Sequence, residues 1–165
     1  PGKVLKKIVN RPVIDLLLTR LSESKKIDQI VVATSKNTKD DALKDVVESL
    51  GYDCYRGNED DILKRFYDAA KKYNADIVVR ITGDCPLVDA NLVDTCITNF
   101  LFSKVDYYSN TLPISYPDGL DIEVMSFLSL ESAHFKASTR FDREHVTPFI
   151  RNSDRFSKKS LVCFC

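Results

Sequence analysis

The segment Asp76–Asp89, DIVVRITGDCPLVD, decides the fold that we predict for this chain of 165 residues. Ile77–Ile81 is a short, mostly β-branched run that ends just before Gly83. A strand buried in a parallel sheet has this pattern, because both of its faces are covered and turn residues follow it. Ligands of open α/β sheets bind beyond the carboxyl ends of the strands, so Asp84 is expected at the mouth of a ligand crevice.

Asp84 itself allows two interpretations. A carboxylate at a strand end can hold Mg²⁺, which favours one or two carboxylates together with substrate phosphates. Asp beside Gly is also ordinary turn chemistry, and Asp often caps a following helix. These residues alone leave both open. The neighbouring Cys85 is expected to be a small buried residue after the turn.

The composition excludes several classes of protein. Hydrophobic residues make up 44% and charged residues 29% of the chain, as in soluble globular domains. The 24 basic and 24 acidic residues cancel, so we expect neither a nucleic-acid nor a membrane partner. Five irregularly spaced cysteines form neither a disulfide framework nor a zinc motif, which favours the cytoplasm. We expect one domain, residues 1–165.

Helical spacing and short apolar runs alternate along the chain. The spacing of apolar residues and the turn signals predict helices over 12–24, 39–50, 59–74, 90–102, 127–137 and 142–152. The apolar runs predict strands over 29–33, 53–56, 76–81, 106–109, 121–126 and 160–165. This alternation indicates an α/β fold with a mainly parallel sheet and helices on both faces.

Polar residues follow two other predicted strands. Thr34 and Ser35 come after strand 29–33, where hydroxyls can contact a base or ribose but are also ordinary in loops. Arg56 ends the next strand and is expected to face the nucleotide or sugar. Asp60 and Asp61, just beyond it, are better explained as acids at the start of a helix.

The loop 110–123, NTLPISYPDGLDIE, is the second strongest candidate region. Asp121 and Glu123 are two residues apart, so on a strand both would point to one face. Like charges repel there unless a cation or water separates them, which favours a sugar or metal role for them. A solvated sheet edge is the alternative, and Asn110 opens the same loop.

Arg143, Glu144 and His145 precede an apolar turn. His145 has the intrinsic pKa of a general base. Without an evident triad partner in the sequence, we interpret it as an ordinary helix histidine.

Six segments resemble, in the same order, the cytidylyltransferase family. The resemblance is strongest to the spore-coat-polysaccharide type, which is related to the enzymes that make CMP-sialic acids and CMP-ketodeoxyoctonate. It covers residues 1 to about 150 and rests on PGKVLKKIVNRPVI, IVVATSKNTKDDAL, YRGNEDDILKRFYDAA, VVRITGDCPLVD, YYSNTLPISYPDGLDIEV and REHVTPFI.

The resemblance implies a Rossmann-like nucleotide-diphospho-sugar transferase fold. It also implies transfer of CMP from CTP to the hydroxyl of an acidic sugar, with Mg²⁺ and release of pyrophosphate, in cell-surface or spore-coat polysaccharide biosynthesis. Relatives are often homodimers. The family's first, central strand would lie ahead of Pro1, and a second metal-binding Asp beyond Cys165, so the chain is expected to lack both.

Mapped onto the family pattern, Lys3 is the basic residue that closes the nucleotide-binding signature, Asp84 is the metal-binding carboxylate, and Arg80 lies upstream on the same strand. With the candidates from the residues themselves, we expect catalytic Lys3 and Asp84, metal-binding Asp84, nucleotide-binding Lys3, Thr34, Ser35, Arg56 and Arg80, and substrate-binding Asn110, Asp121 and Glu123.

Two other functions stay open. The same fold serves nucleotidyltransferases that use another nucleotide or a sugar 1-phosphate. A non-catalytic nucleotide- or sugar-binding module, or an inactive fragment, is the third possibility, because both ends of the family pattern are expected to be missing.

Overall fold

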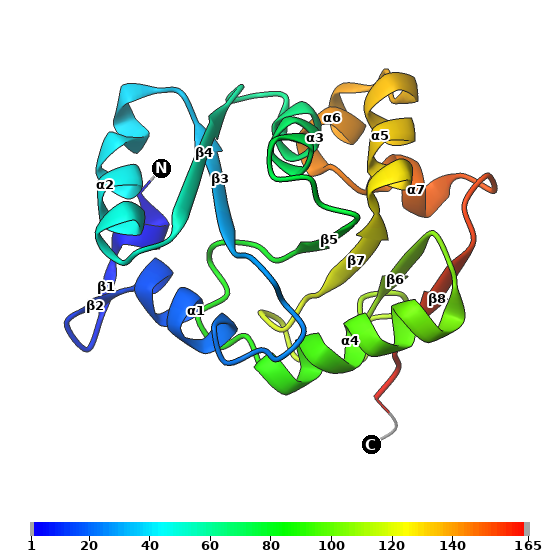
Figure 1. Ribbon diagram of the computed structural model, residues 1–165, viewed down its shortest axis with the longest axis horizontal. Helices are drawn as coiled ribbons and strands as arrows, with labels where there is room; N and C mark the ends of the chain where they lie inside the picture. The colour runs from blue at the N-terminus through cyan, green and yellow to red at the C-terminus, as the bar shows by residue number, and fades with distance from the viewer. Residues whose placement is uncertain (1, 164–165) are drawn as a thin grey trace.

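Helices and strands alternate along residues 2–163, which the computed structural model describes (Figure 1). The strands are β1 (Lys7–Ile8), β2 (Arg11–Pro12), β3 (Val31–Ser35), β4 (Asp53–Gly57), β5 (Ile77–Arg80), β6 (Tyr107–Ser109), β7 (Glu123–Ser126) and β8 (Lys158–Ser160). The α-helices are α1 (Val13–Leu21), α2 (Asp41–Ser49), α3 (Ile62–Lys72), α4 (Ala90–Ser103), α5 (Phe127–Lys136), α6 (Arg140–His145) and α7 (Pro148–Asn152). Two 3₁₀ helices complete the set, η1 (Lys3–Leu5) and η2 (Thr38–Asp40). Over these residues, none of the helices is both long and apolar enough to cross a membrane.

The strands form two sheets and a small hairpin. β3 and β4 pair in parallel, and the larger sheet has the order β5-β7-β6-β8. In it β7 runs antiparallel to both neighbours, and only β6 and β8 are parallel. The prediction of a mainly parallel sheet is therefore wrong for the described residues. A loop rather than a helix joins β6 to β7, and antiparallel neighbours need no helical crossover.

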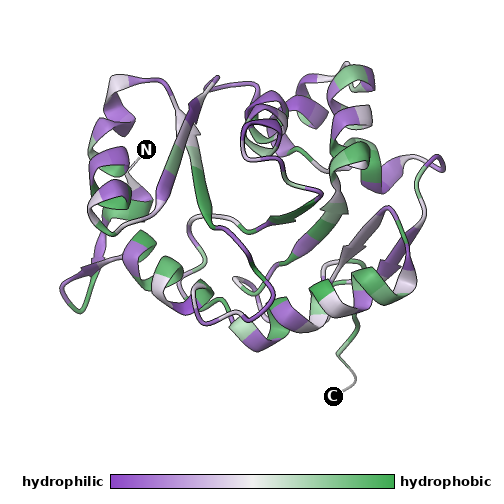
Figure 2. Cartoon of the chain, in the orientation of Figure 1, coloured by the Kyte–Doolittle hydropathy of each residue, from purple (hydrophilic) through white to green (hydrophobic). Residues whose placement is uncertain are grey.

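Helices cover both faces of the larger sheet, as predicted. Neighbouring residues of a strand point to opposite faces. Tyr108 and Val124 belong to a core that they share with α1, α2 and α4. Tyr107 and Met125 belong to a second core, with α3, α5 and α7. In Figure 2 the helices carry both hydrophobic and hydrophilic stretches, whereas β5 is largely hydrophobic.

Most predicted helices are present, but the last one is divided. Ile14, Leu17, Leu18 and Leu21 are buried on α1, at the spacing that predicted it. The predicted helix 142–152 breaks at Val146, whose φ of 73° no helix accommodates, so α6 and α7 replace it. The predicted strand 160–165 overlaps β8 only at Ser160, and its last two residues lie outside the described part of the chain.

A cleft separates the two sheets. Among the described residues, β3 pairs only with β4, and β5 pairs only with β7. The free edges of β3 and β5 both line a cavity of about 680 Å³. Its walls also include apolar residues of α1 and α3. The larger sheet and the β3–β4 pair thus meet across an open, largely apolar space.

Candidate functional site

Strand register brings most of the predicted site residues to two neighbouring groups. In the smaller sheet Ser35 lies opposite Gly57, so Thr34, Ser35 and Arg56 share the carboxyl ends of β3 and β4. In the larger sheet Arg80 lies opposite Glu123. Ser109, which precedes Asn110, also lies opposite Glu123. The carboxyl ends of β5 and β6 therefore meet the beginning of β7.

Asp84 lies on an exposed turn just beyond β5. The turn is held by two backbone hydrogen bonds, from the Cys85 N–H to the Thr82 carbonyl and from the Val88 N–H to the Cys85 carbonyl, both 3.2 Å long. The Cys85 side chain is buried, as predicted, and its Sγ lies 2.9 Å from the Thr82 hydroxyl. Anchored by this buried thiol, the turn leaves the Asp84 side chain exposed.

The segment that carries Lys3 packs against this turn. A Cβ placed on Gly83 would lie 3.3 Å from Cγ1 of Val4, the residue that follows Lys3. Lys3 itself is exposed at the start of η1. The close approach of η1 to Gly83 therefore brings the predicted phosphate-binding lysine to the same end of β5 as Asp84.

Three aspartates are near enough to the buried thiol of Cys85 for their charges to act on it. Burial raises the pKa of Cys85, and the negative charges of Asp84, Asp121 and Asp118 raise it further. Burial also raises the pKa of Asp121, with smaller contributions from Asp118 and Glu123. Asp118 was not among the predicted site residues. Its Pro-Asp-Gly context is typical of a turn, and only the folded loop shows that it lies beside Asp121.

Glu123 is buried and fully engaged. Its carboxylate accepts a 2.6 Å hydrogen bond from the Tyr107 hydroxyl and forms an ion pair with Arg80. Tyr107 is a residue that the sequence did not single out. The expectation that Asp121 and Glu123 share a strand face is wrong, because β7 begins at Glu123 and Asp121 lies ahead of it, exposed.

The Asn110 side chain closes the loop between β6 and β7. Its Nδ2 donates to the Leu120 carbonyl at 2.7 Å, and its Oδ1 accepts from the Ile122 N–H at 2.8 Å. The side chain is almost completely buried. Asn110 therefore shapes the loop that presents Asp121, with its amide group engaged inside the protein.

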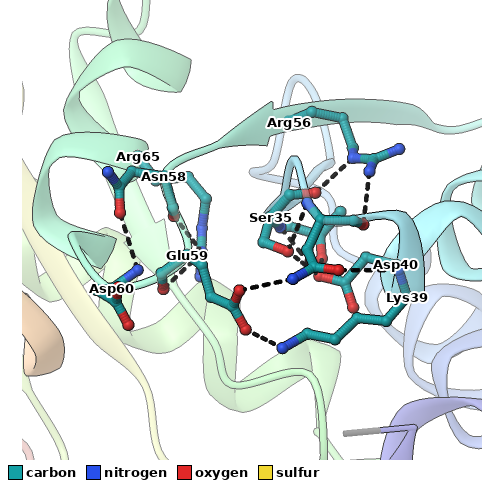
Figure 3. Close-up of polar contacts among 10 residues, drawn as sticks. Ser35, Lys39, Asp40, Arg56, Asn58, Glu59, Asp60 and Arg65 are labelled. Atoms are coloured by element: carbon teal, nitrogen blue, oxygen red, sulfur yellow. Dashed lines mark hydrogen bonds and ion pairs between the residues drawn. The ribbon is translucent and has the colours of Figure 1, made fainter.

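The residues at the ends of β3 and β4 form a closed hydrogen-bond network (Figure 3). Asp40 accepts hydrogen bonds from the hydroxyls of Thr34 (2.8 Å) and Ser35 (2.5 Å). Burial opposes the ionisation of Asp40, but these bonds outweigh it and its pKa lies below the ordinary value. Arg56 donates to the Ser35 carbonyl and forms a 2.8 Å ion pair with Asp41. Sequence reasoning missed Asp40, the residue that holds this group together.

The remaining candidates lie elsewhere. Arg143 forms an ion pair with Asp61 (2.5 Å), which links α6 to the N-cap of α3, so Asp61 is a helix-start residue as predicted. His145 is exposed, and its ring centre lies 4.5 Å from that of Phe141.

The sequence profile of the family described as cytidylyltransferase matches residues 1–162. The chain belongs to this family. An uncharacterized protein of Methanocaldococcus jannaschii is 42% identical over 157 residues, which cover 95% of this chain and 63% of that protein. The spore coat polysaccharide biosynthesis protein SpsF of Bacillus subtilis is 32% identical over 157 residues, which cover 92% of this chain and 64% of SpsF. The cytidylyltransferase chain described here thus spans just under two thirds of these curated relatives.

Solved structures show the same fold. A cytidylyltransferase from Leptospira borgpetersenii superposes with a TM-score of 0.94 at 31% identity, over 99% of this chain and 70% of that one. A CMP:2-keto-3-deoxy-manno-octonic acid synthetase solved with CTP superposes with a TM-score of 0.70 at 15% identity, over 99% of this chain and 84% of that one. The fold is therefore the α/β fold of these nucleotide-diphospho-sugar transferases.

Proposed function

We propose that this chain carries a cytidylyl-transfer site, which moves CMP from CTP to the hydroxyl of an acidic sugar and releases pyrophosphate. Membership of the cytidylyltransferase family supports a nucleotidyltransferase. SpsF is named for spore coat polysaccharide biosynthesis. A 27% identical protein of Shewanella frigidimarina is an 8-amino-3,8-dideoxy-manno-octulosonate cytidylyltransferase. The observation that carries the proposal is the exposed Asp84, beyond β5 and beside the Lys3 segment.

The residues around Asp84 fit Mg²⁺. Asp84 offers an exposed carboxylate, and Asp118 and Asp121 add further oxygen donors near the same turn. Within residues 2–163, no three His, Cys, Asp or Glu side chains are close enough to enclose a metal ion. Mg²⁺ usually takes only one or two carboxylates from the protein and the rest of its coordination from phosphates and water. Bound at Asp84, Mg²⁺ would stabilise charge on the phosphates.

The nucleotide side of the site is assigned to five residues. Attack on the α-phosphate builds negative charge on its oxygens and on pyrophosphate, so a cation fixed nearby favours the transition state. Lys3 supplies that charge from η1, and Arg80, whose charge Glu123 balances, adds hydrogen-bond donors from the end of β5. Thr34, Ser35 and Arg56 define the wall at the ends of β3 and β4, held in place through their bonds within the protein.

The sugar side is assigned to the loop between β6 and β7. Asp121 is exposed there and can accept hydrogen bonds from sugar hydroxyls. Asn110 holds the loop closed through its hydrogen bonds, and Glu123 fixes the end of the loop through its ion pair with Arg80. The loop therefore has one exposed group for the substrate and two buried groups that position it.

The sheet is proposed to continue through the cleft with one more parallel strand between β3 and β5. Both edges are unpaired within residues 2–163 and line the same cavity. Apolar residues of α1 lie on one side of it and of α3 on the other, so a strand could bury side chains on both faces. Such a strand would pair backbone groups that are costly to leave unpaired.

A chimera tests the function directly. The matched 70% of the Leptospira cytidylyltransferase is replaced by this chain, and pyrophosphate release is measured with CTP, Mg²⁺ and a panel of acidic sugars. Turnover is expected, and Asp84→Asn should lower it about 100-fold or more without changing the unfolding midpoint. A folded chimera that releases no pyrophosphate with any sugar, or full activity in Asp84→Asn, would contradict the proposal.

A further inference from the structure

Two arginines in the cleft have an unused hydrogen-bond donor. The Nε atoms of Arg65 and Arg80 are the only buried side-chain nitrogen or oxygen atoms in residues 2–163 without a partner. Both side chains line the cavity between β3 and β5. Because buried polar groups in native proteins nearly always have partners, the space that both arginines face is where an acceptor is expected.

Arg65 is held at the carboxyl end of the smaller sheet. Its stem lies against Gly57, the last residue of β4, where an added Cβ would come within 2.6 Å of the Arg65 Cγ. Its Nη1 donates to the Asn58 carbonyl at 2.8 Å (Figure 3). Arg80 is the last residue of β5. Both guanidinium groups thus lie at the carboxyl ends of strands, near the end of the cleft where Asp84 begins its turn.

The charge of Arg65 is not neutralised by the residues that the structure describes. None of the ion pairs formed among them includes Arg65. Burial lowers the pKa of Arg65, and the negative charge of Asp40, which forms no ion pair with it, offsets this only in part. Arg80 differs, because Glu123 balances its charge. Arg65 is a partly buried cation without an ion-pair partner among these residues, so an anion that reached it would be bound favourably.

We propose that Arg65 is an anion-binding residue that, together with Arg80, binds phosphate groups at the carboxyl end of the cleft. A phosphate chain presents several acceptor oxygens, so it can satisfy both Nε donors and supply the missing negative charge. The apolar walls of the cleft strengthen this attraction by keeping the local dielectric low. The inference deepens the proposed function, on which it rests for CTP as the natural source of the phosphates. If the additional strand proposed between β3 and β5 filled the cleft, its backbone carbonyls could accept from the two Nε donors but would not balance the positive charge of Arg65.

Inorganic tripolyphosphate tests the site without cytidine or sugar. Arginine Nε–H signals are followed by NMR in the unsubstituted chain, with sodium chloride at matched ionic strength as the reference. We expect tripolyphosphate to shift the Nε–H signals of Arg65 and Arg80 together and saturably. If those two signals stay in place while the chain binds tripolyphosphate elsewhere, or if it does not bind, the proposal is overturned.

Matched variants measure the contribution of Arg65. Arg65→Gln is expected to weaken tripolyphosphate binding about tenfold or more, the loss for one charge-assisted hydrogen bond. The control is Arg155→Gln, which removes an exposed arginine and should leave the affinity unchanged. Equal affinities of the two variants would refute the assignment. The NMR titration needs no variant, so it tests the anion site even if Arg65→Gln fails to fold. A negative titration would overturn the anion site without contradicting the proposed CMP transfer.

Discussion

Replacing Glu123 with Gln is expected to destabilise the protein substantially, because it removes the charge that balances Arg80. The Glu123 side chain is 5% exposed and that of Arg80 is 21% exposed. Breaking a buried ion pair by removing one partner costs about 3–5 kcal/mol. Arg80 keeps some contact with water and Gln can still accept from Tyr107, so we place the loss at about 2–3 kcal/mol.

Urea unfolding measures this loss. With an m-value of roughly 2 kcal/mol per M, the midpoint should fall by about 1–1.5 M, and m itself should not change. The control is Glu144→Gln, which disrupts the exposed 3.8 Å pair with Arg140. Exposed pairs contribute little, so the midpoint of the control should change by less than about 0.5 M.

A double-mutant cycle identifies the source of the loss. Arg80→Met removes the cation that pairs with Glu123, so adding Glu123→Gln to it should cost clearly less than Glu123→Gln alone. Strict additivity would show that the loss arises from another contact, such as the Tyr107 hydroxyl. A change in Glu123→Gln no larger than in Glu144→Gln would refute the argument that this pair is buried.

Three further results are expected. Burial opposes ionisation of Asp61, but its hydrogen bonds, above all to Arg143, outweigh this and its pKa lies below the ordinary 3.8. The pair should therefore stabilise the chain above about pH 4 and lose this effect as the pH falls through the lowered pKa. The urea midpoints of Arg143→Met and the parent should differ at pH 7 and converge as the pH falls below that pKa. Burial and neighbouring acids raise the pKa of Asp121, so its charged form is disfavoured in the folded protein. Asp121→Asn should therefore melt at a higher temperature than the parent at pH 7, and this difference should fade as the pH falls below the raised pKa. Gly83→Val should displace Val4, whose Cγ1 lies 3.3 Å from an ideal Cβ on Gly83, and so weaken CTP binding as measured by calorimetry. The control is Gly51→Val, which strains the backbone but places a Cβ where nothing lies within 4 Å, and it should weaken CTP binding less.

Short-range patterns predicted much of the fold. The apolar spacing of α1 and the acid at the start of α3 are local features, and both elements form as expected. The run Ile77–Ile81 contains β5, which ends at Arg80, and Asp84 lies on the turn after it. The prediction of one helix over 142–152 was wrong because Val146 adopts a positive φ, which is not visible in the periodicity of apolar residues.

The candidate site depends on contacts between residues far apart in the sequence. Glu123 gave the same acidic signal as Asp121, yet one is buried against Arg80 and Tyr107 and the other is exposed. Asp40 looked like an ordinary acid near a helix start, and only the fold places it beneath the hydroxyls of Thr34 and Ser35.

The sequence by itself determined where most helices and strands form, and that polar residues follow the strands. These properties depend on a few neighbouring side chains and on the period of the backbone. The tertiary structure alone decided that β7 runs antiparallel to β5, that Glu123 neutralises Arg80, and that Arg65 faces the cleft without a counter-charge. Strand direction and charge pairing are set by which distant segments meet when the core is buried, and an apolar period is the same for a strand running in either direction.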